Sequence, residues 1–229
     1  MKRRLVLFDI DGTLITDGGA ARDAFSEALR AVYGYRGDVN RYDFSGRTDP
    51  QITRMVLGDE GFSDEAIDEG LSDLWREYLA GLRRNATAAR VRALPGIEAL
   101  LQALAPMTHM TIALLTGNIE PGARVKLTPP GLNEYFAFGA FGSDSGDREK
   151  LPPIAVERAS RIDGYRFEGE DVVIIGDSIY DVRCGAPYGA TTIAVASGKT
   201  PAGILRAENP RHFFESAEDF EGLMAAIAG

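Results

Sequence analysis

The chain has 229 residues, 45% of them hydrophobic, and a formal net charge of −9 at pH 7. This length allows one well-filled core, or a core with a smaller lobe. The acidic balance argues against nucleic acid or an anionic membrane surface as the main partner. A single cysteine, Cys184, excludes an internal disulfide framework and fits a reducing compartment. No stretch reaches the roughly 18 apolar residues of a membrane span, so we expect a cytoplasmic protein.

The first predicted element is a buried strand over residues 5–8, which ends in two carboxylates. Asp9 and Asp11 follow it, one residue apart, and Gly12 comes next. Two acidic side chains this close repel each other unless a cation or a shared proton lies between them. The pair is therefore a candidate for chemistry, although a polar turn closed by an Asx hydrogen bond has a similar pattern.

The segment that follows is predicted to be helical and to lack strands. Helical patterns cover residues 20–32, 50–57, 64–71 and 73–82. Such a long helical insertion after the first strand predicts a small separate lobe over residues 16–92. Its two connections to the rest of the chain, near residues 16–19 and 90–94, are the predicted hinges.

The rest of the chain alternates between predicted strands and helices. Strands are expected at residues 111–115, 136–141, 171–175 and 191–195, with helices at 97–104 and 154–162. An edge strand at 208–214 and a closing helix at 217–227 complete the chain. This alternation predicts an α/β fold with a doubly wound, Rossmann-like parallel sheet, built from residues 1–15 and 93–229. Ligands of such sheets bind at the carboxyl ends of the strands.

Polar groups follow three of these strands, where the sheet should bind a ligand. Thr116, Gly117 and Asn118 come after the strand at 111–115. Asp177 comes after the strand at 171–175, with Asp181 four residues further on. Carboxylates bind hard cations, and turns of small residues offer backbone N–H groups to phosphate. A lysine ahead of a predicted helix, Lys150, is placed to reach the same edge.

Taken together, these segments resemble the haloacid dehalogenase (HAD) superfamily, in its phosphoglycolate-phosphatase-like branch with a helical cap. The four motifs of that family occur in order: residues 9–14, the strand that ends at Thr116, Lys150, and residues 176–181. The resemblance implies a HAD core with an inserted α-helical cap domain. It also implies a reaction at phosphorus that depends on Mg²⁺.

The resemblance assigns a role to each carboxylate. Asp9 would be the nucleophile that forms an aspartyl-phosphate, and Asp11 would be the general acid and then the general base. Mg²⁺ would be held by the Asp9 carboxylate, the Asp11 backbone carbonyl and Asp177, an oxygen set that suits this ion. Asp181 would orient a metal-bound water or Lys150.

The resemblance also implies a phosphate cradle. Thr116 and the turn at Gly117 and Asn118 would hold phosphate oxygens, and Lys150 would offset the charge between them and Asp9. The family's lysine is commonly followed by Pro-x-Pro, whereas Lys150 is followed by Leu-Pro-Pro. The register of the prolines favours Lys150, and Arg148 is the rival cation, since a guanidinium binds phosphate bidentately.

In the helical lobe, residues 44–52 interrupt the helical pattern and then open a helix, with Thr48 or Asp49 as its N-cap. Arg47 in this loop is a candidate contact for an anionic substrate. An exposed capping turn that carries a surface arginine is an equal alternative. The loop resembles the corresponding segment of phosphoglycolate-phosphatase-like proteins, and a lid of this size favours small substrates.

These observations favour a Mg²⁺-dependent phosphatase acting on a small phosphomonoester, with phosphoglycolate as the first substrate to test. The partner would be this small phosphate ester, not nucleic acid or membrane, and the protein would be a monomer or homodimer. A sugar phosphomutase similar to β-phosphoglucomutase would keep the same aspartates. A non-catalytic protein that senses phosphate ligands is a further alternative. Carbon–halogen hydrolysis is disfavoured because its leaving group needs no proton from Asp11.

Overall fold

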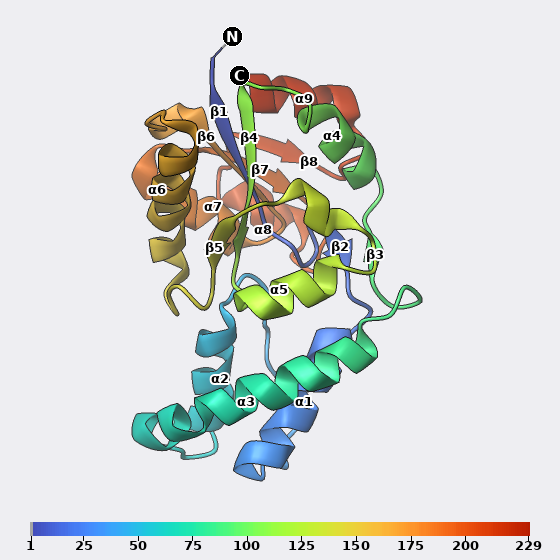
Figure 1. The fold of residues 1–229 in the computed structure, drawn as a ribbon, viewed down its shortest axis with the longest axis vertical. Coiled ribbons are helices and arrows are strands. Elements are labelled where there is room, and N and C mark those ends of the chain that lie inside the picture. Colours follow the sequence, from blue (N-terminus) through green and yellow to red (C-terminus); the bar gives the residue numbers. More distant parts are fainter. Residues whose placement is uncertain (1) are drawn as a thin grey trace.

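Six parallel strands form the central sheet of the computed structural model, which describes residues 2–229 (Figure 1). The strands are β1 (Arg4–Phe8), β4 (Met110–Thr116), β5 (Gly139–Phe141), β6 (Val172–Gly176), β7 (Thr191–Val195) and β8 (His212–Phe214). Their spatial order is β5-β4-β1-β6-β7-β8, with every neighbouring pair parallel. The predicted doubly wound α/β fold is confirmed.

Strand β1 is buried along its whole length because helices cover both faces of the sheet. Val6 and Phe8 belong to a buried cluster with α4 (Ile97–Leu104) and α9 (Phe220–Ala228). Leu5 and Leu7 point the other way, into a cluster with α6 (Leu151–Asp163) and α7 (Ile179–Gly185). The two-residue period of a strand divides these side chains between the two layers. Helices α5 (Glu120–Leu127) and α8 (Ala202–Ala207) complete the core.

The helical lobe lies beyond the carboxyl ends of the strands (Figure 1). It contains α1 (Ala20–Tyr33), α2 (Asp49–Gly58) and α3 (Asp64–Asn85). The chain leaves and re-enters the core through β2 (Ile15–Thr16) and β3 (Arg92–Ala93), an antiparallel pair. This pair lies at the two predicted hinges. That residues 16–92 form a domain able to move as a unit remains a prediction.

Some predicted elements differ from the structure. Residues 64–71 and 73–82 belong to the single helix α3, because the polar pair Ser72 and Asp73 lies on its exposed face and does not end it. The predicted strands at 136–141 and 208–214 shorten to β5 and β8. Helices α5, α7 and α8 and the pair β2–β3 were not predicted. Within residues 2–229, no helix is both long and apolar enough to cross a membrane.

Candidate active site

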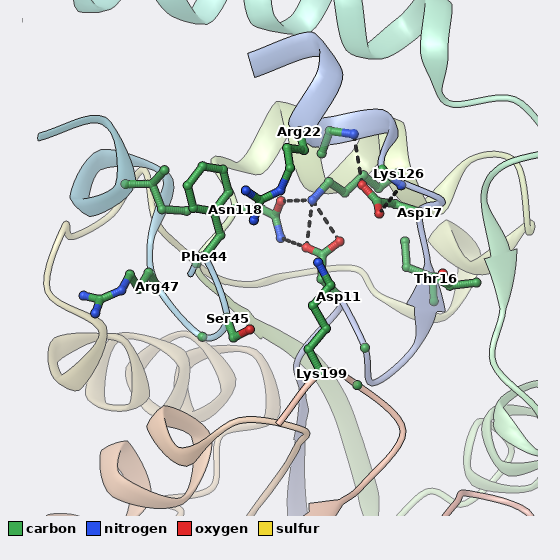
Figure 2. Close-up of a pocket in the computed structure, with 18 of the residues that line it drawn as sticks. Asp11, Thr16, Asp17, Arg22, Phe44, Ser45, Arg47, Asn118, Lys126 and Lys199 are labelled. Atoms are coloured by element: carbon green, nitrogen blue, oxygen red, sulfur yellow. Dashed lines mark hydrogen bonds and ion pairs between the residues drawn. The ribbon is translucent and has the colours of Figure 1, made fainter. Parts of the chain in front are cut away.

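A cavity of about 800 Å³ lies between the carboxyl ends of the strands and the helical lobe. Residues at the carboxyl ends of β1, β4 and β6 line its floor, among them Asp9, Thr116 and Asp177. The lobe contributes polar and aromatic side chains, including Phe44 (Figure 2) and Tyr78. The structure therefore brings together the polar groups that the sequence placed at the ends of three strands.

Glycines allow the first and last of these strand ends to approach each other. Gly12 has a φ of +85°, and a Cβ at this position would lie 2.5 Å from Oδ2 of Asp177. A Cβ at Gly198 would lie 1.6 Å from the same oxygen. Both distances are too short for a side chain, so the Asp177 carboxylate is seated between two stretches of bare backbone.

Three carboxylates form a possible cation site. Asp9, Asp177 and Asp181 each place one oxygen within 4.8 Å of the others. Asp181 accepts hydrogen bonds from the backbone and hydroxyl of Ser178 and from Arg148. By contrast, Oδ2 of Asp9 and Oδ2 of Asp177 accept no hydrogen bond from the described residues. An all-oxygen donor set with two such carboxylates fits a hard divalent cation.

The cation that neutralises this cluster is Arg148, not the preferred Lys150. The Arg148 guanidinium donates to Oδ1 of Asp9 at 2.9 Å and also contacts Asp181, and its side chain is only 4% exposed. The Lys150 side chain is 72% exposed, and its ammonium lies 3.8 Å from the Asp147 carboxylate. Residues 148–150 form a 3₁₀ turn that points Arg148 inward and Lys150 to solvent, so the structure brings Arg148 and not Lys150 to Asp9. Asp181 thus orients Arg148.

The second carboxylate of the first motif points to a different partner. Asp11 accepts hydrogen bonds from the Lys126 ammonium at 2.7 and 2.9 Å and from the Asn118 side-chain amide at 2.8 Å. Figure 2 shows these contacts converging in the cavity. The Asn118 amide also donates to the Thr116 hydroxyl at 2.8 Å. The Asp11 side chain is therefore linked to the turn after β4 and does not belong to the carboxylate cluster.

A family model for haloacid dehalogenase-like hydrolases matches residues 3–189. The chain belongs to this family. Its sequence is 27% identical to a phosphoglycolate phosphatase of Rhodobacter capsulatus, over 98% of this chain and 96% of that protein. A predicted phosphatase of Clostridium acetobutylicum has the same fold, with a TM-score of 0.75 at 18% identity over 98% and 99% of the two chains. A proposed beta-phosphoglucomutase of Bacteroides vulgatus matches with a TM-score of 0.69 at 19% identity, over 100% and 91%.

Lys126 of this HAD hydrolase was not predicted to be a site residue, although the sequence carries a signal that its side chain is buried. On α5, the buried positions are Gly122, Ala123, Lys126 and Leu127, which share one face at helical spacing. A lysine on an otherwise small or apolar face is costly unless a partner pairs with it. Burial alone would lower the pKa of Lys126, but the neighbouring Asp11 carboxylate and Tyr78 hold it above its ordinary value.

In the helical lobe, the first residue of α2 contacts the turn after β4 through both its backbone and its side chain. The Asp49 backbone N–H donates to the Gly117 carbonyl at 2.7 Å, and the Asp49 carboxylate accepts from the Ile119 N–H at 2.8 Å. Thr48 is the N-cap of α2, within a capping box. The Arg47 guanidinium lies over the Tyr180 ring, 5.5 Å from its centroid, and points away from Asp11 and Lys126 (Figure 2). That Arg47 contacts substrate is untested.

The carboxylate cluster predicts how a metal ion should stabilise this hydrolase. Burial and the nearby Asp181 raise the pKa of Asp9 to about 7, and burial with the charge of Asp9 raises the pKa of Asp177 well above its ordinary value. Since these raised values belong to the folded state, the metal-free protein loses stability as pH rises through about 7. A divalent cation offsets the repulsion only where the carboxylates are ionised.

We therefore expect Mg²⁺ to raise the Tm by about 3–6 °C at pH 8 and by much less at pH 5.5, which differential scanning fluorimetry can measure. Asp177→Asn should remove most of the increase at pH 8. An increase that is equal at both pH values would contradict a metal site at these carboxylates.

Proposed function

We propose that the protein is a Mg²⁺-dependent phosphatase that hydrolyses a small phosphomonoester through a phospho-aspartyl intermediate at Asp9. One observation carries the proposal: Arg148 holds one oxygen of the buried Asp9, and the other faces a cavity that also contains Asp11 and Thr116. A carboxylate nucleophile and a separate proton-transfer group are thus present at the same cavity. The phosphatase-named relative that matches nearly the whole chain supports this chemistry.

In the first step, a carboxylate oxygen of Asp9 attacks phosphorus and the bond from phosphorus to the ester oxygen breaks. Asp11 gives a proton to the departing alcohol. In the second step, Asp11 takes a proton from water, which attacks phosphorus and releases phosphate and the Asp9 carboxylate. Mg²⁺ bound by Asp9, Asp177 and the Asp11 carbonyl would neutralise charge on the phosphoryl group.

The phosphoryl oxygens need donors while charge moves between the alcohol and Asp9. The Thr116 hydroxyl and the backbone N–H of Gly117 lie at the end of β4, where they can supply hydrogen bonds, whereas the Asn118 N–H donates to the Thr116 hydroxyl at 3.3 Å. Arg148 contacts Asp9 and Asp181 at the opposite side of the cluster and offsets the negative charge. No step requires Lys150.

Phosphoglycolate is the first substrate to test, because a phosphoglycolate phosphatase is similar to this chain from end to end. The cavity volume of about 800 Å³ allows larger metabolites as well. A sugar phosphomutase would use the same Asp9 and Asp11 but would return the phosphoryl group to the substrate.

A phosphate-release screen over a broad panel of small phosphomonoesters tests this function. We expect release for at least one member, at a rate that depends on Mg²⁺ and falls at least tenfold on addition of EDTA. Formation of an isomerised sugar phosphate in the presence of a bisphosphate primer, without net phosphate release, would instead identify a mutase. Absence of turnover for all members would favour a phosphate-binding protein without catalytic activity.

A further inference from the structure

Lys126 contributes a buried ammonium group to the site, and the proposed reaction does not account for it. The residue is 4% exposed, and the ammonium group donates to Oδ2 and Oδ1 of Asp11 at 2.7 and 2.9 Å. It also donates to Oδ1 of Asn118 at 2.6 Å. These contacts match the three N–H groups of an ammonium ion. Burying a charge this deeply costs free energy, so its complete set of partners on two site residues points to a function.

The contact with Lys126 fixes the orientation of the Asn118 amide. Because Oδ1 of Asn118 accepts from Lys126, the amide nitrogen faces Asp11 and Thr116, to which it donates at 2.8 Å each. The opposite orientation would place the amide N–H groups against the ammonium and the amide oxygen against the Asp11 carboxylate. Thr116 accepts hydrogen bonds from both the backbone and the side chain of Asn118, so its own hydroxyl hydrogen can be directed to a phosphoryl oxygen.

The same contacts make the two oxygens of Asp11 different. Oδ2 accepts from both Lys126 and Asn118, whereas among residues 2–229 Oδ1 accepts only from Lys126, at the longer distance of 2.9 Å. When Oδ1 carries a proton, Lys126 can keep its contacts with Oδ2 and with Asn118. Oδ1 is therefore the oxygen that can exchange a proton with the alcohol or with water.

We propose that Lys126 is a positioning residue for proton transfer, which, together with Asn118, holds Oδ2 of Asp11 so that Oδ1 faces the leaving alcohol. This inference rests on the proposed phosphatase function. Lys126 does not touch the reacting atoms in this role. It acts through the direction of the Asp11 carboxylate and through the Asn118 amide, which also directs the Thr116 hydroxyl.

Leaving groups of different basicity separate this role from a merely structural one. An alkyl alcohol needs a proton as it departs, whereas p-nitrophenolate does not. The test compares kcat/KM, which includes the departure of the leaving group but not the later attack by water. For Lys126→Met, we expect kcat/KM for an alkyl phosphate from the panel, 2-phosphoglycolate first, to fall about 30-fold. For p-nitrophenyl phosphate, the fall should be less than about threefold.

Two further variants serve as controls. Lys126→Arg should restore part of the loss on the alkyl phosphate. The matched control Lys2→Met removes the same charge at the surface beside Asp171 and should change neither value of kcat/KM.

A double-mutant cycle keeps the test decisive if Lys126→Met lowers stability. In an Asp11→Asn background, Lys126→Met should cause little further loss on the alkyl phosphate, because no proton can be transferred through residue 11. Equal losses on both substrates, or a full additional loss in that background, would overturn the positioning role and leave the phosphatase function intact. If the wild-type protein hydrolysed neither substrate nor any panel member, the proposed function itself would fail.

Discussion

Asp9→Asn should lower kcat by at least about 10⁴-fold, the scale seen when a covalent nucleophile is removed. The amide has nearly the same shape as the carboxylate but cannot form the bond to phosphorus. The substitution should also weaken Mg²⁺ binding, since within residues 2–229 Oδ2 of Asp9 accepts no hydrogen bond and is free to bind a cation. Phosphate release from the best panel substrate measures the loss, and mass spectrometry of the rapidly quenched wild-type enzyme should show phosphate on the peptide that contains Asp9.

The loss of activity in Asp9→Asn should not come from unfolding. Burial raises the pKa of Asp9 to about 7, so the ionised carboxylate is unfavourable to the fold at pH 8 in the absence of metal. Asparagine removes that charge while Arg148 keeps its contact with Asp181. We therefore expect the metal-free variant to have a Tm at pH 8 equal to or above that of the wild type. Retention of more than a few per cent of the activity, in a variant verified to contain no Asp9, would exclude this residue as the nucleophile.

The residues at the strand ends could be predicted because each of them lies next to an apolar run in the sequence, and such a run predicts a buried strand. The carboxyl-terminal halves of β1, β4 and β6 are buried, and polar residues and glycines follow each of them closely. Parallel strands in one sheet bring their carboxyl ends to the same edge, so the convergence of Asp9, Thr116 and Asp177 follows from the topology.

The cations could not be placed in the same way, because their positions depend on the local direction of each side chain. Arg148 and Lys150 are two residues apart, and a 3₁₀ turn that no hydrophobic period reveals decides which of them faces Asp9. Lys126 lies on a short helix that was not predicted, and its partner Asp11 is 115 residues away in the sequence. The cap loop illustrates the same limit, since its backbone contacts Gly117 whereas the Arg47 side chain points elsewhere.

Arg148→Met should lower kcat/KM by about 10²–10³-fold, the scale of losing one charge-stabilising group in an active site. The methionine removes the charge beside Asp9 and Asp181 and leaves three neighbouring carboxylates without a cation from the protein. Breaking a buried ion pair also costs roughly 3–5 kcal/mol of folding free energy, so the folded fraction is measured by circular dichroism at each assay temperature.

Two variants separate the role of Arg148 from a general loss of stability. Arg148→Lys keeps a cation that can reach Asp9, and should recover at least about tenfold of the activity lost in Arg148→Met. Lys150→Met removes the same charge two residues away, from an ammonium that is exposed and 3.8 Å from Asp147, and should change kcat/KM by less than about twofold. If Lys150→Met were the inactive variant and Arg148→Met the active one, Lys150 would have to reach the nucleophile during turnover. We expect Arg148→Met to be the inactive variant and Lys150→Met the active one. The charge balance of the site is the reason, because only a cation in contact with Asp9 and Asp181 can stabilise three buried carboxylates while phosphate is also bound.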